Sequence, residues 1–227
     1  MPDALTAVMT ARMILEAGAV KYSAEQPFFL SSGWASPVYI DVPRLISFPR
    51  IRRTLMDLAA ETVLTRIGFE QLDTVVGTES TGIAYAAWIA ERLSLPLQFV
   101  RRRARGFGRE AQIEGSLKPG ARVLLVDDIT TDGRSKVAHC RTLRALDARV
   151  EHVLVLFFYD IFSEARALFS ELKITLHYLA TWRDILAEAR ASGYFAGPTA
   201  LEVERFLEAP ARWSLEHGGI GSFPRRA

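Results

Sequence analysis

One stretch in the middle of the chain joins an apolar run to two adjacent carboxylates, a polar loop and the start of a helix. It reads Val123-Leu124-Leu125-Val126-Asp127-Asp128-Ile129-Thr130-Thr131-Asp132-Gly133-Arg134-Ser135. Loop amides and a helix N-terminus present donors and a positive dipole end to an anion, which suits a phosphate monoester. Two neighbouring carboxylates are stabilised by vicinal hydroxyls or by a divalent cation. These residue types predict a site for a phosphorylated sugar that carries Mg²⁺; the alternative is a solvated strand end with a helix cap.

Positive charge is concentrated in a second stretch. Arginines number 24 in the chain and lysines only four, and five of the arginines fall between residues 101 and 109, together with Gly106 and Gly108. Cations on a loop with glycine hinges would close over a polyphosphate and complete its site. The alternative is a solvated basic face, but the clustering beside the glycines favours the loop.

A third stretch, Gly77-Thr78-Glu79-Ser80-Thr81-Gly82, joins an apolar run to an alanine-rich helical pattern. Its amides and hydroxyls suit an anion, although an ordinary strand-to-helix turn would look the same. The four histidines show no ligand spacing, so we expect them to be packed or surface residues. Cys140 is the only cysteine, which excludes an intrachain disulfide and a cysteine-based zinc site, and it should be a small core residue.

The elements that must position these stretches follow from hydrophobic periodicity. Apolar runs typical of buried strands alternate with amphipathic helical patterns, which predicts an α/β fold with a mostly parallel sheet covered on both faces. The carboxyl edge of such a sheet is where ligands bind. The predicted strands are 73–76, 97–101, 122–126, 150–158 and 174–179, and the predicted helices between them are 82–93 and 135–146.

Three segments are expected along the chain. Residues 1–60 should hold a helix at 6–17 and a small hood at 28–42, packed over the carboxyl edge of the sheet. Residues 61–195 should form the core. Residues 196–227 should be a peripheral C-terminal helix and tail.

Composition excludes several classes of protein. The chain has 227 residues, of which 49% are hydrophobic and 24% charged, with a net charge of +2. These values exclude a disordered chain, a collagen-like chain and a strongly basic nucleic-acid coat. No stretch approaches the roughly 20 apolar residues of a membrane span, and the start of the chain lacks a signal-peptide pattern. We therefore expect a cytoplasmic protein that binds neither membrane nor nucleic acid.

Residues 123–135 resemble the phosphoribosyl-pyrophosphate (PRPP) signature of type I phosphoribosyltransferases, which is four apolar residues, Asp-Asp, two apolar residues and Thr-Thr-Gly-Gly-Ser. The match has no gaps, but Thr130, Asp132 and Arg134 depart from the pattern. Further motifs resemble the orotate phosphoribosyltransferase family: the hood segment from Phe28 to Asp41, the turn at 77–83, and the segment 99–115 with its Gln-Ile-Glu-Gly ending.

This resemblance implies the type I phosphoribosyltransferase fold, with a central mostly parallel sheet flanked by helices and a small N-terminal hood. It implies Mg²⁺-dependent transfer of the phosphoribosyl group from PRPP to orotate, giving orotidine 5′-monophosphate and pyrophosphate in pyrimidine (UMP) biosynthesis. The implied catalytic residues are Arg102, Arg105, Asp127 and Asp128. The implied PRPP-binding residues are Thr78, Thr81, Arg101, Arg102, Arg105, Asp127, Asp128, Thr130, Thr131, Asp132, Gly133, Arg134 and Ser135. The implied base-binding residues are Ser31, Tyr39 and Thr131. No direct protein ligand to the metal is expected, and Asp127 and Asp128 are the candidates if one exists.

The resemblance also implies a homodimer in which the loop carrying Arg102 and Arg105 reaches the neighbouring active site. Two alternatives stay open. Ser31 and Asp160 stand at positions that are often basic in the family, which leaves a phosphoribosyltransferase for another base as one alternative; Phe107 stands where a histidine is frequent, which removes a proton donor from the loop. A non-catalytic PRPP- or RNA-binding regulator with the same fold is the other, although the low net charge and the single aromatic residue in the arginine loop argue against it.

Overall fold

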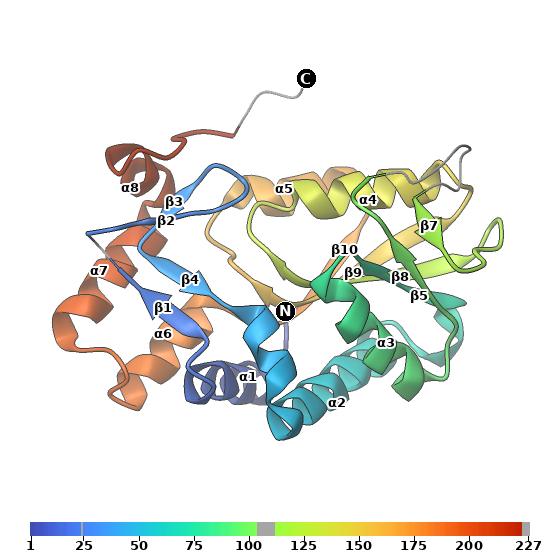
Figure 1. Cartoon of the computed structure of the whole chain (residues 1–227), viewed down its shortest axis with the longest axis horizontal. Helices are drawn as coiled ribbons and strands as arrows, with labels where there is room; N and C mark the ends of the chain where they lie inside the picture. The colour runs from blue at the N-terminus through green and yellow to red at the C-terminus, as the bar shows by residue number, and fades with distance from the viewer. Residues whose placement is uncertain (24, 104–111, 224–227) are drawn as a thin grey trace.

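A six-stranded sheet forms the centre of the computed structural model, which describes residues 1–23, 25–103 and 112–223. The strands run in the order β10-β9-β8-β5-β6-β7, and all neighbours are parallel except the antiparallel pair of β6 and β7 (Figure 1). The mostly parallel sheet predicted from the apolar runs is therefore confirmed. Its strands are β5 (Thr74–Thr78), β6 (Leu97–Val100), β7 (Ile113–Glu114), β8 (Arg122–Thr130), β9 (Arg149–Phe158) and β10 (Thr175–Thr181).

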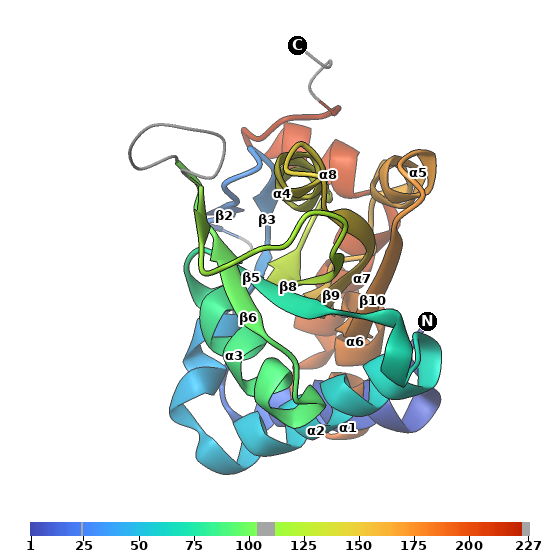
Figure 2. The ribbon, with the colours of Figure 1, turned by 90° about the vertical axis from the view of Figure 1, so that its right-hand side faces the viewer.

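Alternate residues of the central strands enter two separate hydrophobic cores. In β8, Leu124 and Val126 belong to one core, whereas Val123 and Leu125 belong to the other. Burial on both faces explains why these strands read as continuous apolar runs. One face carries α1 (Ala4–Glu16), α2 (Pro49–Arg66), α3 (Thr81–Leu93) and α6 (Trp182–Ala191), and the other carries α4 (Arg134–Arg144) and α5 (Ser163–Glu171) (Figure 2).

Strand β8 extends to Thr130, beyond the end at residue 126 that the sequence predicted. Its pairing with β5 ends at Gly77 and Val126, and from there only β9 accompanies it. The chain leads from β5 to β6 on one side and from β8 to β9 on the other, so the sheet changes direction between β5 and β8. Open α/β sheets bind ligands at such a switch point. The last residues of β8 therefore border the expected crevice.

The hood consists of two short antiparallel pairs. Strand β1 (Val20–Tyr22) pairs with β4 (Val38–Ile40), and β2 (Phe28–Phe29) pairs with β3 (Ala35–Ser36). The 3₁₀ helix η1 (Val42–Ser47) then leads into α2, and a second one, η2 (Phe69–Gln71), precedes β5.

The segment after α6 braces the hood from outside. It contains α7 (Gly197–Glu208) and α8 (Pro210–Glu216). The amide of Ala35 donates to Ser214 Oγ over 2.9 Å, and the amide of Ile220 donates to the carbonyl of Gly33 over 3.0 Å. The predicted division of the chain at residue 196 stays a prediction, but these contacts join the C-terminal segment to the hood.

Some elements were absent from the sequence prediction. Helix α2 buries Leu55, Met56, Ala59 and Val63 along one side, yet its first turns contain several arginines that conceal this periodicity. Helices α5 and α6 and strand β7 were also not predicted. Among the described residues, no helix is both long enough and apolar enough to cross a membrane. Cys140 is fully buried, as predicted.

Candidate active site

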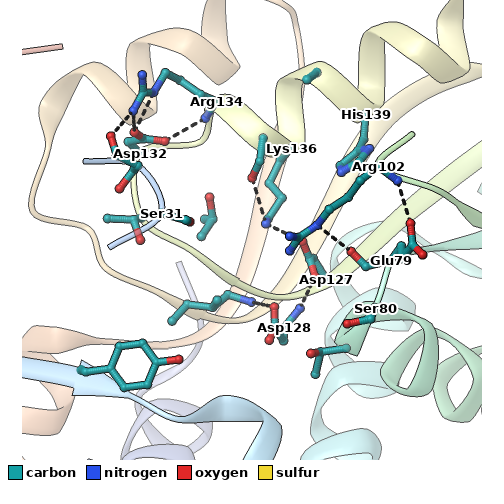
Figure 3. A pocket seen from close by; sticks show the side chains of 18 residues that line it. Ser31, Glu79, Ser80, Arg102, Asp127, Asp128, Asp132, Arg134, Lys136 and His139 are labelled. Atoms are coloured by element: carbon teal, nitrogen blue, oxygen red, sulfur yellow. Dashed lines mark hydrogen bonds and ion pairs between the residues drawn. The ribbon is translucent and has the colours of Figure 1, made fainter. Parts of the chain in front are cut away.

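A pocket of about 660 Å³ lies at the carboxyl edge of the sheet, between the end of β8, the β5–α3 turn and the hood (Figure 3). It brings together most of the residues predicted for the site, from segments far apart in the sequence. Those predicted residues are Ser31, Tyr39, Thr81, Arg102, Asp127, Asp128, Thr130, Thr131, Asp132, Arg134 and Ser135. Thr78, Arg101 and Gly133 are not in its wall, and Arg105 lies outside the described residues.

The acidic pair at the end of β8 is bonded unequally. One oxygen of Asp127 accepts from the amide of Asp128 over 2.9 Å, and the other forms an ion pair with the ammonium of Lys136. Asp128 accepts from the amide of Ile129 over 2.8 Å through one oxygen. In Figure 3, Lys136 reaches from α4 toward Asp127. Both oxygens of Asp127 are thus engaged, whereas Asp128 faces the pocket with acceptor capacity to spare.

The two carboxyl groups have opposite pKa shifts. Burial acts to raise the pKa of Asp127, but the Lys136 ammonium outweighs burial, and the pKa is lowered from its ordinary value. Burial and the neighbouring charge of Asp127 raise the pKa of Asp128 to about 7. Near neutral pH Asp127 is therefore ionised and Asp128 is protonated in about half of the molecules, and a ligand that donates hydrogen bonds would favour the ionised form of Asp128.

The β5–α3 turn packs directly against this pair. A Cβ atom on Gly82 would lie 2.5 Å from Thr78 Oγ1 and 2.8 Å from Asp127 Oδ1, so a side chain at this position would displace the turn. The hydroxyl of Thr78 is buried and has no hydrogen-bond partner among the residues that the structure describes. Thr81 and Ser80 face the pocket from the same turn.

The negative charge of Glu79, in the same turn, is stabilised by contacts with two arginine residues. Its carboxylate accepts from the amide of Arg102 over 3.0 Å and lies 3.7 Å from the Arg101 guanidinium. Arg101 also pairs with Glu114 at 2.7 Å, which explains why its side chain is absent from the pocket wall. The Arg102 side chain is exposed, and its one hydrogen bond to the described residues is to the carbonyl of Glu79, over 3.3 Å. In the part of the chain that the structure describes, Arg102 is therefore the cation at this end of the pocket that no carboxylate side chain pairs with.

Arg134 links the phosphate loop, our name for residues 131–135 after the phosphate site that the sequence predicts there, to the hood. Its guanidinium donates to Asp132 over 2.7 Å and to the carbonyl of Ser32 over 2.8 Å. Gly133, with a φ of +80°, makes the turn that starts α4 directly before it. Arginine at a position where the family signature has glycine is accommodated because its side chain leaves the loop and reaches the hood.

Ser31, Ser32 and Tyr39 form the hood wall of the pocket. The Ser32 hydroxyl is buried without a hydrogen-bond partner in the described part of the chain, and the centre of the Tyr39 ring lies 5.8 Å from that of Phe28. Burial, followed by the charge of Asp41, raises the pKa of Tyr39, so its hydroxyl is a donor at neutral pH.

Asp160, which follows β9, does not bring its negative charge into this pocket. Its carboxylate accepts two hydrogen bonds from Arg166, over 2.7 and 2.6 Å, and it is not part of the pocket wall.

The sequence prediction missed two basic residues of the site. Lys136 and His139 both line the pocket from α4. Burial and the nearby Lys136 ammonium lower the pKa of His139. The first two turns of a helix that begins at a phosphate loop lie next to the ligand. The position of Lys136 and His139 directly after Ser135 was therefore the sequence signal that could have identified them.

The donor set fits a magnesium ion that is already coordinated by a substrate. Mg²⁺ binds oxygen ligands and commonly uses one or two carboxylates together with substrate phosphates. Asp128 and the hydroxyls of Thr130, Thr131 and Ser135 supply such oxygens. In the part of the chain that the structure describes, no group of three or more His, Cys, Asp or Glu side chains could hold a metal by itself.

A model of the phosphoribosyl transferase domain matches residues 45–170. The orotate phosphoribosyltransferase of Sinorhizobium medicae is 49% identical over 223 residues, covering 98% of this chain and 96% of its own. That of Rhizobium etli is 50% identical over 220 residues, covering 96% and 95%.

Solved structures show the same likeness. The orotate phosphoribosyltransferase of Aeropyrum pernix has a TM-score of 0.68 at 31% identity and covers 82% of this chain and 99% of its own. The Leishmania donovani UMP synthase has a TM-score of 0.76 at 28% identity, covering 88% of this chain but 42% of that longer one.

Proposed function

The chain belongs to the orotate phosphoribosyltransferase family, and on this premise we propose how its pocket carries out the transfer from PRPP to orotate. The observation that supports the proposal is that the acidic pair, the phosphate loop and the hood share one pocket. A ligand with a phosphate, vicinal hydroxyls and a planar ring needs all three walls at once.

The PRPP half of the ligand is assigned to the sheet edge. The 5-phosphate binds the amides and hydroxyls of residues 131–135 at the N-terminus of α4, where the helix dipole favours an anion. Asp128 accepts hydrogen bonds from the ribose hydroxyls. The pyrophosphate binds against Thr81 and Arg102, with Arg105 as a further cation.

The transfer forms a bond between C1 of the ribose and a ring nitrogen of orotate as the bond from C1 to the pyrophosphate oxygen breaks. The pyrophosphate leaves with the electron pair, and the ring nitrogen releases its proton. Positive charge develops on the sugar and negative charge on the leaving group. When bound, Mg²⁺ supplies charge neutralisation on the pyrophosphate. The chain itself contributes position, through Asp128 and the phosphate loop, and charge, through Arg102 and Arg105.

Orotate is assigned to the hood wall, with Ser31, Tyr39 and Thr131 around the ring. Asp160 offers no repulsion to the orotate carboxylate because Arg166 neutralises it away from the pocket. The product, orotidine 5′-monophosphate, makes this a step of UMP synthesis.

Steady-state turnover with PRPP, Mg²⁺ and a panel of pyrimidine and purine bases tests the assignment. We expect pyrophosphate release with orotate and at least about a hundredfold lower kcat/KM with uracil, which lacks the carboxylate. Turnover with another base and none with orotate would overturn it, as would strong, salt-dependent RNA binding without any turnover.

We also propose a cytoplasmic homodimer whose active sites are shared between subunits. Mixing Arg105→Ala with Asp127→Asn protein should restore partial activity, because one of the two sites in each heterodimer would then combine an intact loop with an intact acidic pair. Confirmed heterodimers that stay inactive would argue against sharing.

A further inference from the structure

Lys136 is set apart from the other lysines of the chain by its burial. Its side chain is 8% exposed, whereas Lys21, Lys118 and Lys173 are all exposed. It is the third residue of α4 and lines the pocket. Its ammonium forms the ion pair with Asp127 and lies 3.1 Å from Ser135 Oγ. Taking an ammonium out of water is costly, so a lysine in this position needs its carboxylate partner.

The charges around the acidic pair leave Lys136 as its only direct counterion among the described residues. Arg102 contacts Glu79, and Arg134 pairs with Asp132. Lys136 occupies one oxygen of Asp127, and the amide of Asp128 occupies the other. Without such a partner, two adjacent carboxylates could together ligate a divalent cation. Here only Asp128 can offer a free oxygen.

We propose that Lys136 is a positioning residue that prevents Asp127 from ligating a divalent cation, so that the unliganded protein binds no such ion and the metal enters only with the pyrophosphate-bearing substrate. The ammonium of Lys136 neutralises the charge of Asp127 that a metal ion would otherwise neutralise. It leaves Asp128 as the single carboxylate offered to the ligand. This inference rests on the proposed function for the identity of the substrate, but not for the behaviour of the empty site.

Titration with Mn²⁺, followed by the electron paramagnetic resonance signal of the free ion, tests the proposal without PRPP or base. Wild type should bind no Mn²⁺ more tightly than the millimolar range. Lys136→Met should gain one site of at least about tenfold higher affinity, because both carboxylates become available. Lys136→Arg should behave as wild type, and Lys118→Met, which removes an exposed lysine, is the control for net charge.

The double variant Lys136→Met/Asp127→Asn should lose the gained site, since one carboxylate remains. Circular dichroism would establish that each variant is folded. An unchanged Mn²⁺ affinity in folded Lys136→Met would overturn the proposal. So would tight stoichiometric binding by the wild type that Asp127→Asn abolishes, a result that does not require the Lys136 variants to fold. A protein that used another base would still give the expected Mn²⁺ result, so the two proposals fail separately.

Discussion

At the amino edge of the sheet Arg122 forms a forked contact with Asp73, whereas at the carboxyl edge Lys136 is, among the described residues, the single cation paired with the acidic pair Asp127 and Asp128. The fork is made of the Arg122 amide, Nε and a terminal nitrogen, at 2.8, 3.0 and 2.7 Å from the Asp73 carboxylate. These bonds hold the pKa of Asp73 well below its usual range. The pKa of Asp128 at the opposite edge is instead raised to about 7 by burial and by Asp127.

A second pair of titratable side chains near the amino edge, His152 and His177, is made of two histidines in contact with each other. His152 Nδ1 and His177 Nε2 lie 3.2 Å apart on β9 and β10. Burial and the neighbouring His152 lower the pKa of His177 to about 4, so the pair is neutral near pH 7. At the amino edge, these titratable side chains pair with one another. At the carboxyl edge, Asp128 and Arg102 keep hydrogen-bonding groups that a ligand can use. Stability and ligand binding are assigned to opposite ends of the same strands.

Asp128→Asn should have the largest effect, and it should change activity and stability in opposite directions. We expect kcat/KM to fall by about 10²–10³, because the charged acceptor for the ribose hydroxyls is lost. Since the raised pKa makes the ionised form of Asp128 unfavourable in the folded empty site, the free energy of unfolding at pH 8 should rise by about 1–2 kcal/mol. Steady-state kinetics and urea unfolding measure the two effects.

Asp73→Asn is the matched control at the amino edge. It should lower the unfolding temperature and leave kcat/KM unchanged. If Asp128→Asn unfolded more readily than wild type at pH 8, or if Asp73→Asn were inactive, the assignment of stability to the amino edge and ligand binding to the carboxyl edge would be wrong.

Arg102→Ala should have the next largest effect. Loss of the exposed guanidinium should raise KM for PRPP and lower kcat/KM by about 30-fold, with less effect on KM for orotate, because the lost charge faces the pyrophosphate. Arg149→Ala at the amino edge changes the net charge equally and should change neither constant by more than about twofold. Equal losses in both variants would mean that overall charge, not position, attracts PRPP.

His177→Gln should have the smallest effect, visible only as a change in pH dependence. The unfolded chain takes up a proton on His177 near pH 6.5 and the folded chain only near pH 4, so stability is complete above pH 6.5 and is lost as the pH falls through this window. The variant should lose about 1–2 kcal/mol less than wild type between pH 6.5 and 4. Urea unfolding at intervals of pH measures this difference, and parallel curves would refute it.

The sequence predicted the carboxyl edge better than the amino edge because the site is carried by local motifs. Asp127 and Asp128 follow an apolar run and precede a helix start, which is a short-range pattern. The contact of His152 with His177 depends on how β9 and β10 are aligned, and spacing along the chain does not reveal it. The two histidines are packed residues, as expected, but their contact with each other was not predicted.

Lys136 escaped prediction for a different reason. A lysine in the first turn of an amphipathic helix usually lies on the solvated face, and only the direction of α4 turns it toward Asp127. The extra length of β8 was also unpredictable, because it depends on β9 continuing beside it after β5 has ended.

The bond from Ala35 to Ser214 spans 179 residues of sequence. During synthesis the hood leaves the ribosome before its outer brace is made. At about 5–20 residues per second, the interval is roughly 10–40 s. We therefore expect a nascent chain to carry an unbraced hood during this interval, with the proposed base-binding wall becoming rigid only when the segment that contains Ser214 arrives.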